Sequence, residues 1–318
     1  MKPIFGIHFI FLSLIFNNDK SYTQSAVFRV TYGIKITSGH NHYKTFRICI
    51  PLVLDNEYQK IHKIQLHSKV QPAAIVRSKK HGLQYYYFRL EKYFQRQKTI
   101  SLTLEAEIQK TSRQITHFNR VPGKLITNSP FYRFFTRSDI YADKDIPIVK
   151  KWAKEVQGLN PIHAGKIIFE KVKKYLKIQP RFLGLFPLRE IIKRKSGECS
   201  DFSQLFTAVM RAAGIPARIV VGRVLTRDVK MSFHIWAEFY AAGYGWIPCD
   251  PFYYFRRKLL FGYQPEDYLI MHYDTGIPAP AGEITSRLPM LQTYYYFYNT
   301  EKPVSPPVIE YIWSCTKK

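Results

Sequence analysis

The sequence predicts an α+β protein in which a β-sandwich domain precedes a core where a cysteine-bearing helix packs on an antiparallel sheet. Three observations predict this. Strand-like segments run from Val27 to about Ile115 with no convincing helix, helical patterns begin after Ser138, and strands follow the apolar helical pattern that starts at Cys199. With 318 residues and 46% hydrophobic content, the chain is long enough for two domains with real cores.

The N-terminal half is predicted as a β-sandwich over residues 26–125. Alternation is plainest in its last strand, where Ile100, Leu102 and Leu104 share one face and Thr103 and Glu105 share the other. Short strands at this spacing are typical of a sandwich. We interpret the aromatic run at 85–88 as half-buried strand rather than a stacking platform, because aromatic residues are common strand formers.

The first residues are typical of a secretory signal peptide. Lys2 precedes an apolar run from Ile4 to Phe16, which spans roughly 20 Å as a helix and is shorter than the ~30 Å hydrocarbon core of a bilayer. We predict a signal peptide over residues 1–25 with cleavage near Ser25, and hence a periplasmic or secreted protein. A retained anchor and a buried first element are the alternatives. No other long apolar stretch suggests a second membrane segment.

The chain is strongly basic: 48 Lys and Arg against 23 Asp and Glu give a net charge of +25. Charge of this size favours a polyanionic partner, whether nucleic acid, phospholipid or cell-wall polymer. Export favours an anionic envelope polymer and argues against nucleic acid. The charge therefore indicates a class of partner and no reaction.

The four cysteines are too few and too scattered for a disulfide scaffold. Without a C-x-x-C pair or a Cys/His cluster, the sequence predicts no structural zinc site, and we expect no metal and no cofactor. Cys49 and Cys315 lie in strand-like segments outside the central motif. If the protein is exported they could pair, but we favour separate buried thiols.

The predicted core covers residues 138–275, and residues 276–318 are predicted as a C-terminal extension containing strands. Two helices are expected first, over 146–157 and 162–177, with Asn160-Pro161 as the turn between them. The third helix begins at or just before Cys199. Its apolar side chains recur at three- and four-residue spacing until Gly214 stops it.

A hairpin follows the third helix, formed by "SFHIWAEFY" and "GYGWIPCD" around the loop "AAG". A turn centred on residue 242 places His234 opposite Asp250, and residue 238 opposite residue 246. His234, Trp236 and Glu238 share one face of the strand, while Cys249 points to the other. The Asp250 carboxylate is then placed to accept a proton from one ring nitrogen of His234.

Cys199, His234 and Asp250 are the groups that nucleophilic thiol chemistry needs. A thiol requires a base, and the base requires an orienting acceptor. A helix N-terminus beside an imidazolium is expected to lower the thiol pKa, and its N–H groups can stabilise an oxyanion. Each residue alone is more often structural: a buried thiol, a strand histidine, a turn carboxylate. The joint arrangement is what predicts catalysis.

The segments "GECSDFSQLFTAVMRAAGIPARIVVGRV", "HIWAEFYAAGYGWIPCDP" and "LLFGYQPEDYLIM" resemble the transglutaminase-like superfamily, over about residues 146–271. The resemblance implies a papain-like core with Cys199 as nucleophile, His234 as general base and Asp250 as its orienter. Ser200-Asp201 stands where animal crosslinking enzymes have Trp, and Phe252 where many members have Thr. The sequence is thus more similar to the bacterial branch, which implies hydrolysis of an amide bond or transfer of its acyl group to an amine.

We therefore predict an exported thiol enzyme acting on a protein or peptide through an acyl-enzyme on Cys199. The alternative is a catalytically silent envelope-binding or scaffold protein that uses its basic surface. Nucleic-acid binding, the third interpretation, would require cytoplasmic residence.

Several neighbouring residues are predicted to be structural. Asp201 should support the first helical turn and pair with Arg218, and Glu238 should be a hydrogen-bond partner. We interpret Trp236 and Trp246 as core residues rather than walls of an acyl pocket.

Overall fold

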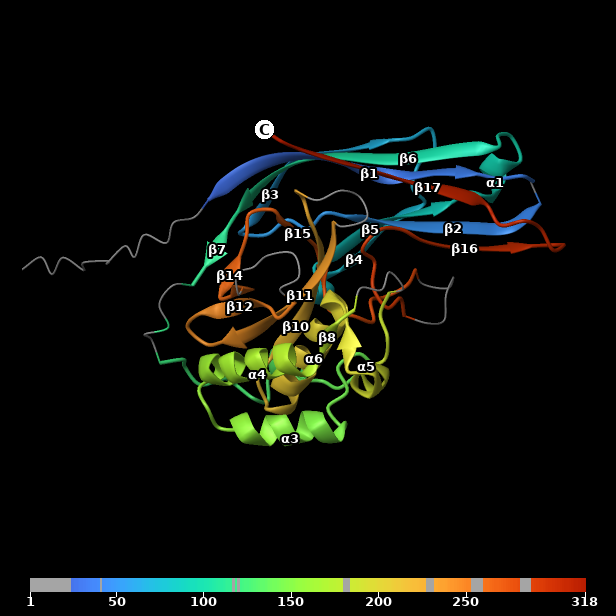
Figure 1. The fold of residues 1–318 in the computed structure, drawn as a ribbon. Coiled ribbons are helices and arrows are strands. Elements are labelled where there is room, and N and C mark those ends of the chain that lie inside the picture. Colours follow the sequence, from blue (N-terminus) through green and yellow to red (C-terminus); the bar gives the residue numbers. More distant parts are fainter. Residues whose placement is uncertain are drawn as a thin grey trace, which may run out of the picture.

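Two parts make up the molecule: a β-sandwich and a core of helices on a mainly antiparallel sheet (Figure 1). The computed structural model describes residues 24–40, 42–115, 118, 121–179, 184–226, 232–252, 260–280 and 287–318. The predicted fold class, an α+β core with a preceding β-sandwich, is confirmed. All but the last two residues of the predicted signal peptide lie outside the described part of the chain.

The sandwich consists of two four-stranded antiparallel sheets. The first has the order β17 (Val308–Lys317), β1 (Ser25–Thr37), β6 (Thr99–Thr111), β3 (Gln59–His67). The second has the order β16 (Tyr295–Thr300), β2 (Tyr43–Leu52), β5 (Leu83–Arg89), β4 (Ala74–Ser78).

Alternation in β6 is as predicted, because Ile100, Leu102 and Leu104 are buried between the sheets. The strand interpretation of residues 85–88 is also confirmed: they belong to β5, and Tyr85, Tyr87 and Phe88 are buried.

The last two strands of the chain are edge strands of the sandwich. β17 pairs with β1 in one sheet, and β16 pairs with β2 in the other. The sandwich thus contains segments that precede and segments that follow the core in the sequence (Figure 1).

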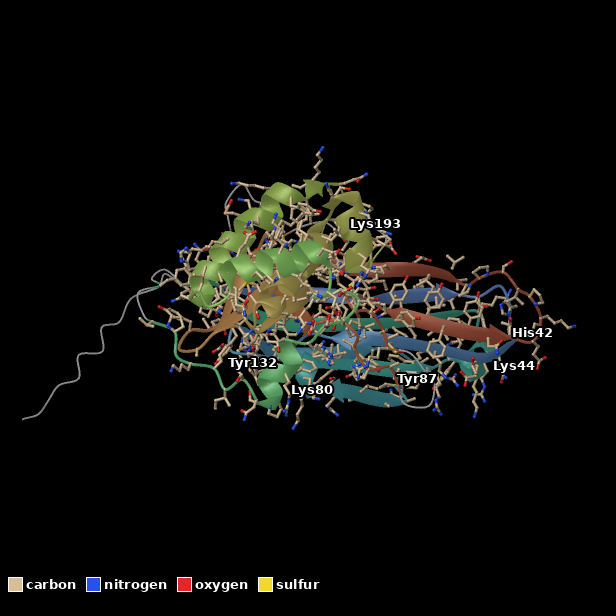
Figure 2. All side chains as sticks on the ribbon, turned by 90° about the horizontal axis from the view of Figure 1, so that it is seen from below. His42, Lys44, Lys80, Tyr87, Tyr132 and Lys193 are labelled. Atoms are coloured by element: carbon tan, nitrogen blue, oxygen red, sulfur yellow. The ribbon has the colours of Figure 1, made fainter. Side chains whose placement is uncertain are left out.

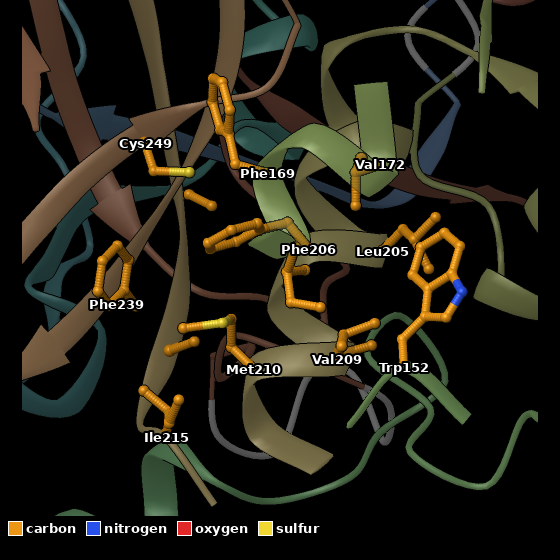
Figure 3. Close-up of a cluster of buried hydrophobic side chains, with 14 of the residues drawn as sticks. Trp152, Phe169, Val172, Leu205, Phe206, Val209, Met210, Ile215, Phe239 and Cys249 are labelled. Carbon is orange, nitrogen blue, oxygen red and sulfur yellow. The ribbon is translucent and has the colours of Figure 1, made fainter. Parts of the chain in front are cut away.

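The core sheet has the order β13 (Leu260–Phe261), β12 (Gly245–Asp250), β11 (Phe233–Ala241), β10 (Ala217–Val224), β15 (Tyr268–Tyr273). Helix α6 (Cys199–Ala212) packs on β10 and β11, with α3 (Pro147–Val156) and α4 (Pro161–Tyr175) packed against α6. Figure 3 shows Phe206 and Met210 of α6 between the helices and the strand residues Phe239 and Cys249.

The predicted helices of the core are confirmed, and their ends follow from capping. Pro147 and Pro161 occupy first-turn positions where a missing N–H costs nothing. The Asn160 side chain accepts a hydrogen bond from Ile162 N at 2.9 Å. Beyond α6, Gly214 has a φ of 80°, the left-handed conformation that ends a helix.

Short elements connect these parts. They are η1 (Lys79–His81), α1 (Glu91–Phe94), β7 (Arg113–Gln114), α2 (Pro130–Phe135), β8 (Lys177–Ile178), α5 (Leu188–Arg194), β9 (Ser196–Gly197) and β14 (Tyr263–Gln264). Parallel pairing of β8 with β9 fixes the chain just before α6.

Arg223 of β10 joins the core to the last strand of the sandwich. Its guanidinium is buried, lies 3.9 Å from the ring centres of both Phe233 and Trp313, and donates to Tyr311 Oη at 2.5 Å. Stacking on two aromatic faces and a directed hydrogen bond use the planar shape of arginine. The position of β17 is therefore coupled to the sheet that carries His234.

Positive charge is spread over both parts of the molecule. Figure 2 shows Lys193 extending from the helical layer and Lys44 and Lys80 from the sandwich. In the described part of the chain, no helix is both long and apolar enough to cross a membrane.

Candidate active site

Cys199 is the first residue of α6, and its position is fixed by a reciprocal cap. Glu198 is the N-cap: its side chain accepts from the Asp201 backbone, and its own N–H donates to Asp201 Oδ2 at 3.0 Å. A Cβ on Gly197 would lie 2.1 Å from Asp201 Oδ2, so glycine is needed there for the close approach. The predicted structural role of Asp201 is confirmed.

The predicted partner of Asp201 is wrong. Arg194 of α5 lies 3.5 Å from Asp201 Oδ2. Arg218 instead donates to Glu238 at 2.6 Å, because β10 and β11 place the two residues directly opposite each other. This pair and Arg113, 3.3 Å from Glu238, confirm that Glu238 is a structural hydrogen-bond partner.

The Cys199 side chain is half-buried and lies against the start of β11. It packs on buried Ile219, Val221 and Ile235, and the sulfur forms a hydrogen bond with the backbone of Ile235. Ile235 directly follows His234 in the chain. The fold thus brings the thiol next to the strand segment that carries the predicted base.

The electrostatics of the thiol differ from the expectation of a lowered pKa. Burial raises the pKa of Cys199 well above its ordinary value, the Glu198 carboxylate raises it further, and the hydrogen bond with Ile235 acts in the opposite direction. Desolvation outweighs the helix end because a thiolate there would lose most of its hydration. The expected lowering of the thiol pKa is therefore wrong, and burial favours the neutral thiol.

His234 and Asp250 form a direct buried pair. His234 Nε2 lies 2.6 Å from Asp250 Oδ2, and the two side chains are 0% and 3% exposed. Since a carboxylate only accepts, Nε2 carries the proton in this contact. The pair is almost inaccessible to water, whereas the thiol is partly exposed.

The hairpin register differs from the prediction by two residues. Glu238 pairs with Pro248, and Tyr240 with Trp246, because the turn runs from Ala241 to Tyr244 with Gly243 at a φ of 90°. The turn centre is thus at 243 rather than 242. A shift of two residues in pairing keeps every side chain on its face, so His234 still reaches Asp250, diagonally rather than directly across.

Asp250 has two further partners that sequence analysis missed. Tyr268 of β15 donates to Oδ2 at 2.9 Å, and the Phe252 backbone N–H donates to Oδ1 at 3.1 Å. The Tyr268 ring also contacts the His234 ring edge to face, with centroids 5.0 Å apart. The only signal for Tyr268 was its presence in the resembling segment at 259–271, because β15 reaches the site across β10.

The remaining candidates are structural. Trp236 is buried against Val220, Val224 and Ile270, as the core interpretation predicted, whereas Trp246 is half-buried and packs with Phe131 and Phe135 outside the buried core.

Cys249 is buried in the core on the other face from Asp250. All four cysteines lie in the described part of the chain and are free thiols, with Cys49 and Cys315 in different sheets of the sandwich. Separate thiols, the favoured interpretation, are what the structure has. Among the described residues, no cluster of His, Cys, Asp or Glu is arranged to hold a metal ion.

Helix α6, with Cys199 at its N-terminus, packs on the sheet that carries the buried His234–Asp250 pair. Residues 150–251 match the family model of the transglutaminase-like superfamily. The predicted resemblance is confirmed over that segment, which contains Cys199, His234 and Asp250.

Individual proteins are also similar to the chain. An uncharacterized protein of Haemophilus influenzae is 25% identical over 251 residues, 70% of this chain and 67% of that protein. A solved structure from Cytophaga hutchinsonii, provisionally named a cysteine protease, is 15% identical with a TM-score of 0.66 over 93% of this chain and 92% of that one. This similarity shows that the whole architecture, sandwich included, occurs elsewhere.

The periplasmic domain of TgpA from Pseudomonas aeruginosa is 14% identical, with a TM-score of 0.37 over 72% of this chain and 88% of that domain.

Proposed function

We propose that the protein is an exported thiol hydrolase that cleaves an amide or peptide bond in a protein or peptide through Cys199, His234 and Asp250. The observation that carries the proposal is the 2.6 Å contact between His234 Nε2 and Asp250 Oδ2, one residue along the strand from Ile235, which contacts the thiol. A carboxylate that occupies Nε2 leaves Nδ1 as the ring nitrogen to exchange a proton with sulfur.

Acylation begins from neutral partners. The Cys199 Sγ–H proton passes to His234 Nδ1 while sulfur bonds to the carbonyl carbon. The imidazolium then gives this proton to the amide nitrogen, the C–N bond breaks, and the amine leaves as the thioester forms. Asp250, held by Tyr268 and the Phe252 N–H, stabilises the imidazolium throughout.

Deacylation reverses the roles of the groups. Water gives a proton to His234 Nδ1 as its oxygen bonds to the acyl carbon. The C–S bond breaks, the carboxylic acid leaves, and the proton returns to sulfur. An amine in place of water gives acyl transfer by the same path, and the product distinguishes the two reactions.

The end of α6 supports the charge that develops during both steps. Helix N-termini carry partial positive charge, and first-turn N–H groups lack partners within the helix. We expect the N–H groups of Cys199 and Ser200 to donate to the oxyanion. Because the resting thiol is neutral, this stabilisation acts on the tetrahedral intermediate rather than on a ground-state thiolate.

One observation favours the alternative of a silent binding protein: burial raises the pKa of Cys199 instead of lowering it. The exposed lysines of the helical layer would then bind an anionic envelope polymer; they include Lys150, Lys151, Lys154, Lys166, Lys174 and Lys177. This alternative leaves the buried His–Asp pair without a role, which is why we favour catalysis.

Alkylation with iodoacetamide, followed by peptide mass spectrometry, tests the proposal. We expect Cys199 to react faster than Cys315, which is also half-buried, and His234→Ala to slow only Cys199. Cys199→Ala should abolish amide hydrolysis, while Cys315→Ala should not. Equal rates at both thiols in the native chain and in His234→Ala would favour the silent binding protein. N-terminal sequencing of the protein from cell envelopes tests export, with a start near Ser25 expected.

A further inference from the structure

Two apolar side chains from separate segments share a packing surface with the thiol. Leu185, Cys199 and Met290 are each partly exposed, and all three pack on the same buried floor of Ile219, Val221 and Ile235. The floor is the sheet face just beyond the N-terminal end of α6. An apolar surface therefore begins at the sulfur and continues along the sheet.

Met290 is held in place on both sides. Leu291 is buried, and its N–H donates to His272 Nε2 at 3.0 Å. Gln292 Nε2 donates to the carbonyl oxygens of Gly222 at 2.5 Å and His234 at 3.1 Å. The segment that carries Met290 is thus hydrogen-bonded to the strand residue predicted as the base.

Leu185 is positioned from the opposite side. The neighbouring Phe186 ring lies 4.6 Å from the Arg194 guanidinium, and Arg194 contacts Asp201 in the first turn of α6. Two residues further on, Leu188 is buried and its N–H donates to Ile140 O at 2.9 Å. Leu185 and Met290 therefore have defined positions relative to Cys199.

The chemistry of this surface indicates what can bind it. The five apolar side chains of this surface offer no hydrogen-bond donor or acceptor apart from the weak thioether of Met290. A polar or charged group placed there would lose hydration without compensation. In the acyl-enzyme the acyl carbon is bonded to sulfur. The group attached to that carbon is consequently the part of the substrate nearest the surface.

We propose that Leu185 and Met290, on the floor of Ile219, Val221 and Ile235, form an acyl-side subsite that selects substrates with a large apolar side chain next to the cleaved amide. This inference rests on the proposed function of Cys199. Removing a few methylene groups from such a contact typically changes kcat/KM by roughly 10–200-fold. The enzyme would thus select substrates by the side chain on the carbonyl side of the cleaved amide bond.

Esters with one leaving group isolate the acyl side. We suggest measuring Cys199-dependent hydrolysis of the 4-nitrophenyl esters of acetic acid, N-acetyl-leucine and N-acetyl-serine with the full chain. We expect kcat/KM for the leucine ester to exceed that for the serine ester by roughly tenfold or more. Met290→Gln and, separately, Leu185→Gln should each lower this ratio at least threefold and leave the acetyl ester nearly unchanged. Leu159→Gln, at an exposed leucine between α3 and α4, is the control.

The outcomes separate the two proposals. Hydrolysis that persists in Cys199→Ala refutes the proposed function, and the subsite with it. Two outcomes refute the subsite alone. In the first, hydrolysis requires Cys199 but shows no preference for the leucine ester. In the second, the rates for all three esters fall equally in both folded variants. Thermal unfolding of each variant identifies misfolding, and the two independent positions keep the test decisive if one variant fails to fold.

Discussion

Tyr268 Oη and His234 Nε2 share a single acceptor, Asp250 Oδ2, at 2.9 and 2.6 Å. The two donors come from strands on opposite sides of β10, so the tyrosine reaches across the sheet to the carboxylate that holds the imidazole. A hydrogen bond from Tyr268 draws negative charge from this oxygen. Its strength therefore sets how strongly Asp250 stabilises a proton on the imidazole.

Tyr268→Phe should lower the rate of the reaction while preserving the fold. Without the hydroxyl, Asp250 Oδ2 loses one of its two side-chain donors and is held less firmly beside His234. We expect kcat to fall roughly threefold to tenfold with little change in KM. Tyr240→Phe, on the same sheet but packed against Trp246, is the control. An unchanged kcat in a folded Tyr268→Phe variant would show that Tyr268 serves packing only.

The raised thiol pKa predicts how alkylation of Cys199 depends on pH. Because burial raises the pKa of this thiol, little thiolate exists at neutral pH, and the rate with iodoacetamide should keep rising beyond pH 9. In His234→Ala the neutral-pH rate should fall at least fivefold while the alkaline rate changes less. A rate that levels off near pH 6 or 7 would contradict the raised pKa of Cys199.

Gly197→Ala should loosen the helix end that carries the nucleophile. The added methyl group would overlap Asp201 Oδ2, so either the cap opens or the chain before Cys199 moves. Overpacking of this kind costs roughly 1–3 kcal/mol, which urea unfolding can measure. Activity should fall more than stability implies, because the displaced residue is two positions from the sulfur. Gly39→Ala is a neutral control, since nothing lies near a Cβ built there.

Lys110 is a buried ammonium between the sandwich and the core. It donates to Gln59 Oε1 at 3.0 Å, and Gln59 also bonds both backbone groups of Ile270 in β15. Burial lowers the pKa of Lys110 to about 7, although Asp267 and Glu238 act in the opposite direction. The unfolded chain keeps this proton to near pH 10, so the cost of burying it is fully present below pH 7 and declines as pH rises toward 10.

Lys110→Met should therefore stabilise the protein most at low pH. At about 1.4 kcal/mol per pKa unit, we expect the free energy of unfolding at pH 6 to rise by roughly 1–4 kcal/mol, with a smaller gain at pH 9. Gln59 Oε1 retains its bond from Ile270 N, so no acceptor is left without a partner. Urea unfolding at both pH values tests this, with the exposed Lys63→Met as control. A gain that is the same at both pH values would argue against the titration.

Arg223→Lys should separate charge from shape at the junction with β17. Lysine keeps the positive charge but cannot stack flat between Phe233 and Trp313 while bonding Tyr311. We expect a loss of roughly 1–3 kcal/mol in thermal unfolding. Limited proteolysis should also release the C-terminal strand first. Arg77→Lys, on the exposed edge strand β4, should have no effect.

Local patterns carried much of the fold and of the site. The apolar spacing after Cys199 predicted α6, and alternation around His234 placed it on the same face as Asp250. The register failed by two residues because two nearby glycines, 243 and 245, both adopt positive φ, and the sequence does not say which residues form the turn. Tyr268 and the lysine–glutamine junction at Lys110 depend on contacts between distant strands, which no local pattern encodes.

The thiol pKa shows a different limit. A helix end and a nearby histidine predict an acidic thiol, but burial of Cys199 against Ile219, Val221 and Ile235 raises its pKa. Desolvation depends on packing in three dimensions, so only the folded structure reveals that it prevails.

β1 pairs with β17, with Phe28 opposite Lys317, so the whole core lies in the sequence between two strands that are neighbours in one sheet. During synthesis the first sandwich strand is made long before its edge partner, and β2 similarly waits for β16. The core is thus synthesised before either strand, and Arg223 receives its aromatic neighbour Trp313 only after β17 has been made. Addition of β16 and β17 to the sandwich is thus a late, long-range event. The contacts of Arg223 with β17, next to the sheet that carries His234, form only when it has occurred.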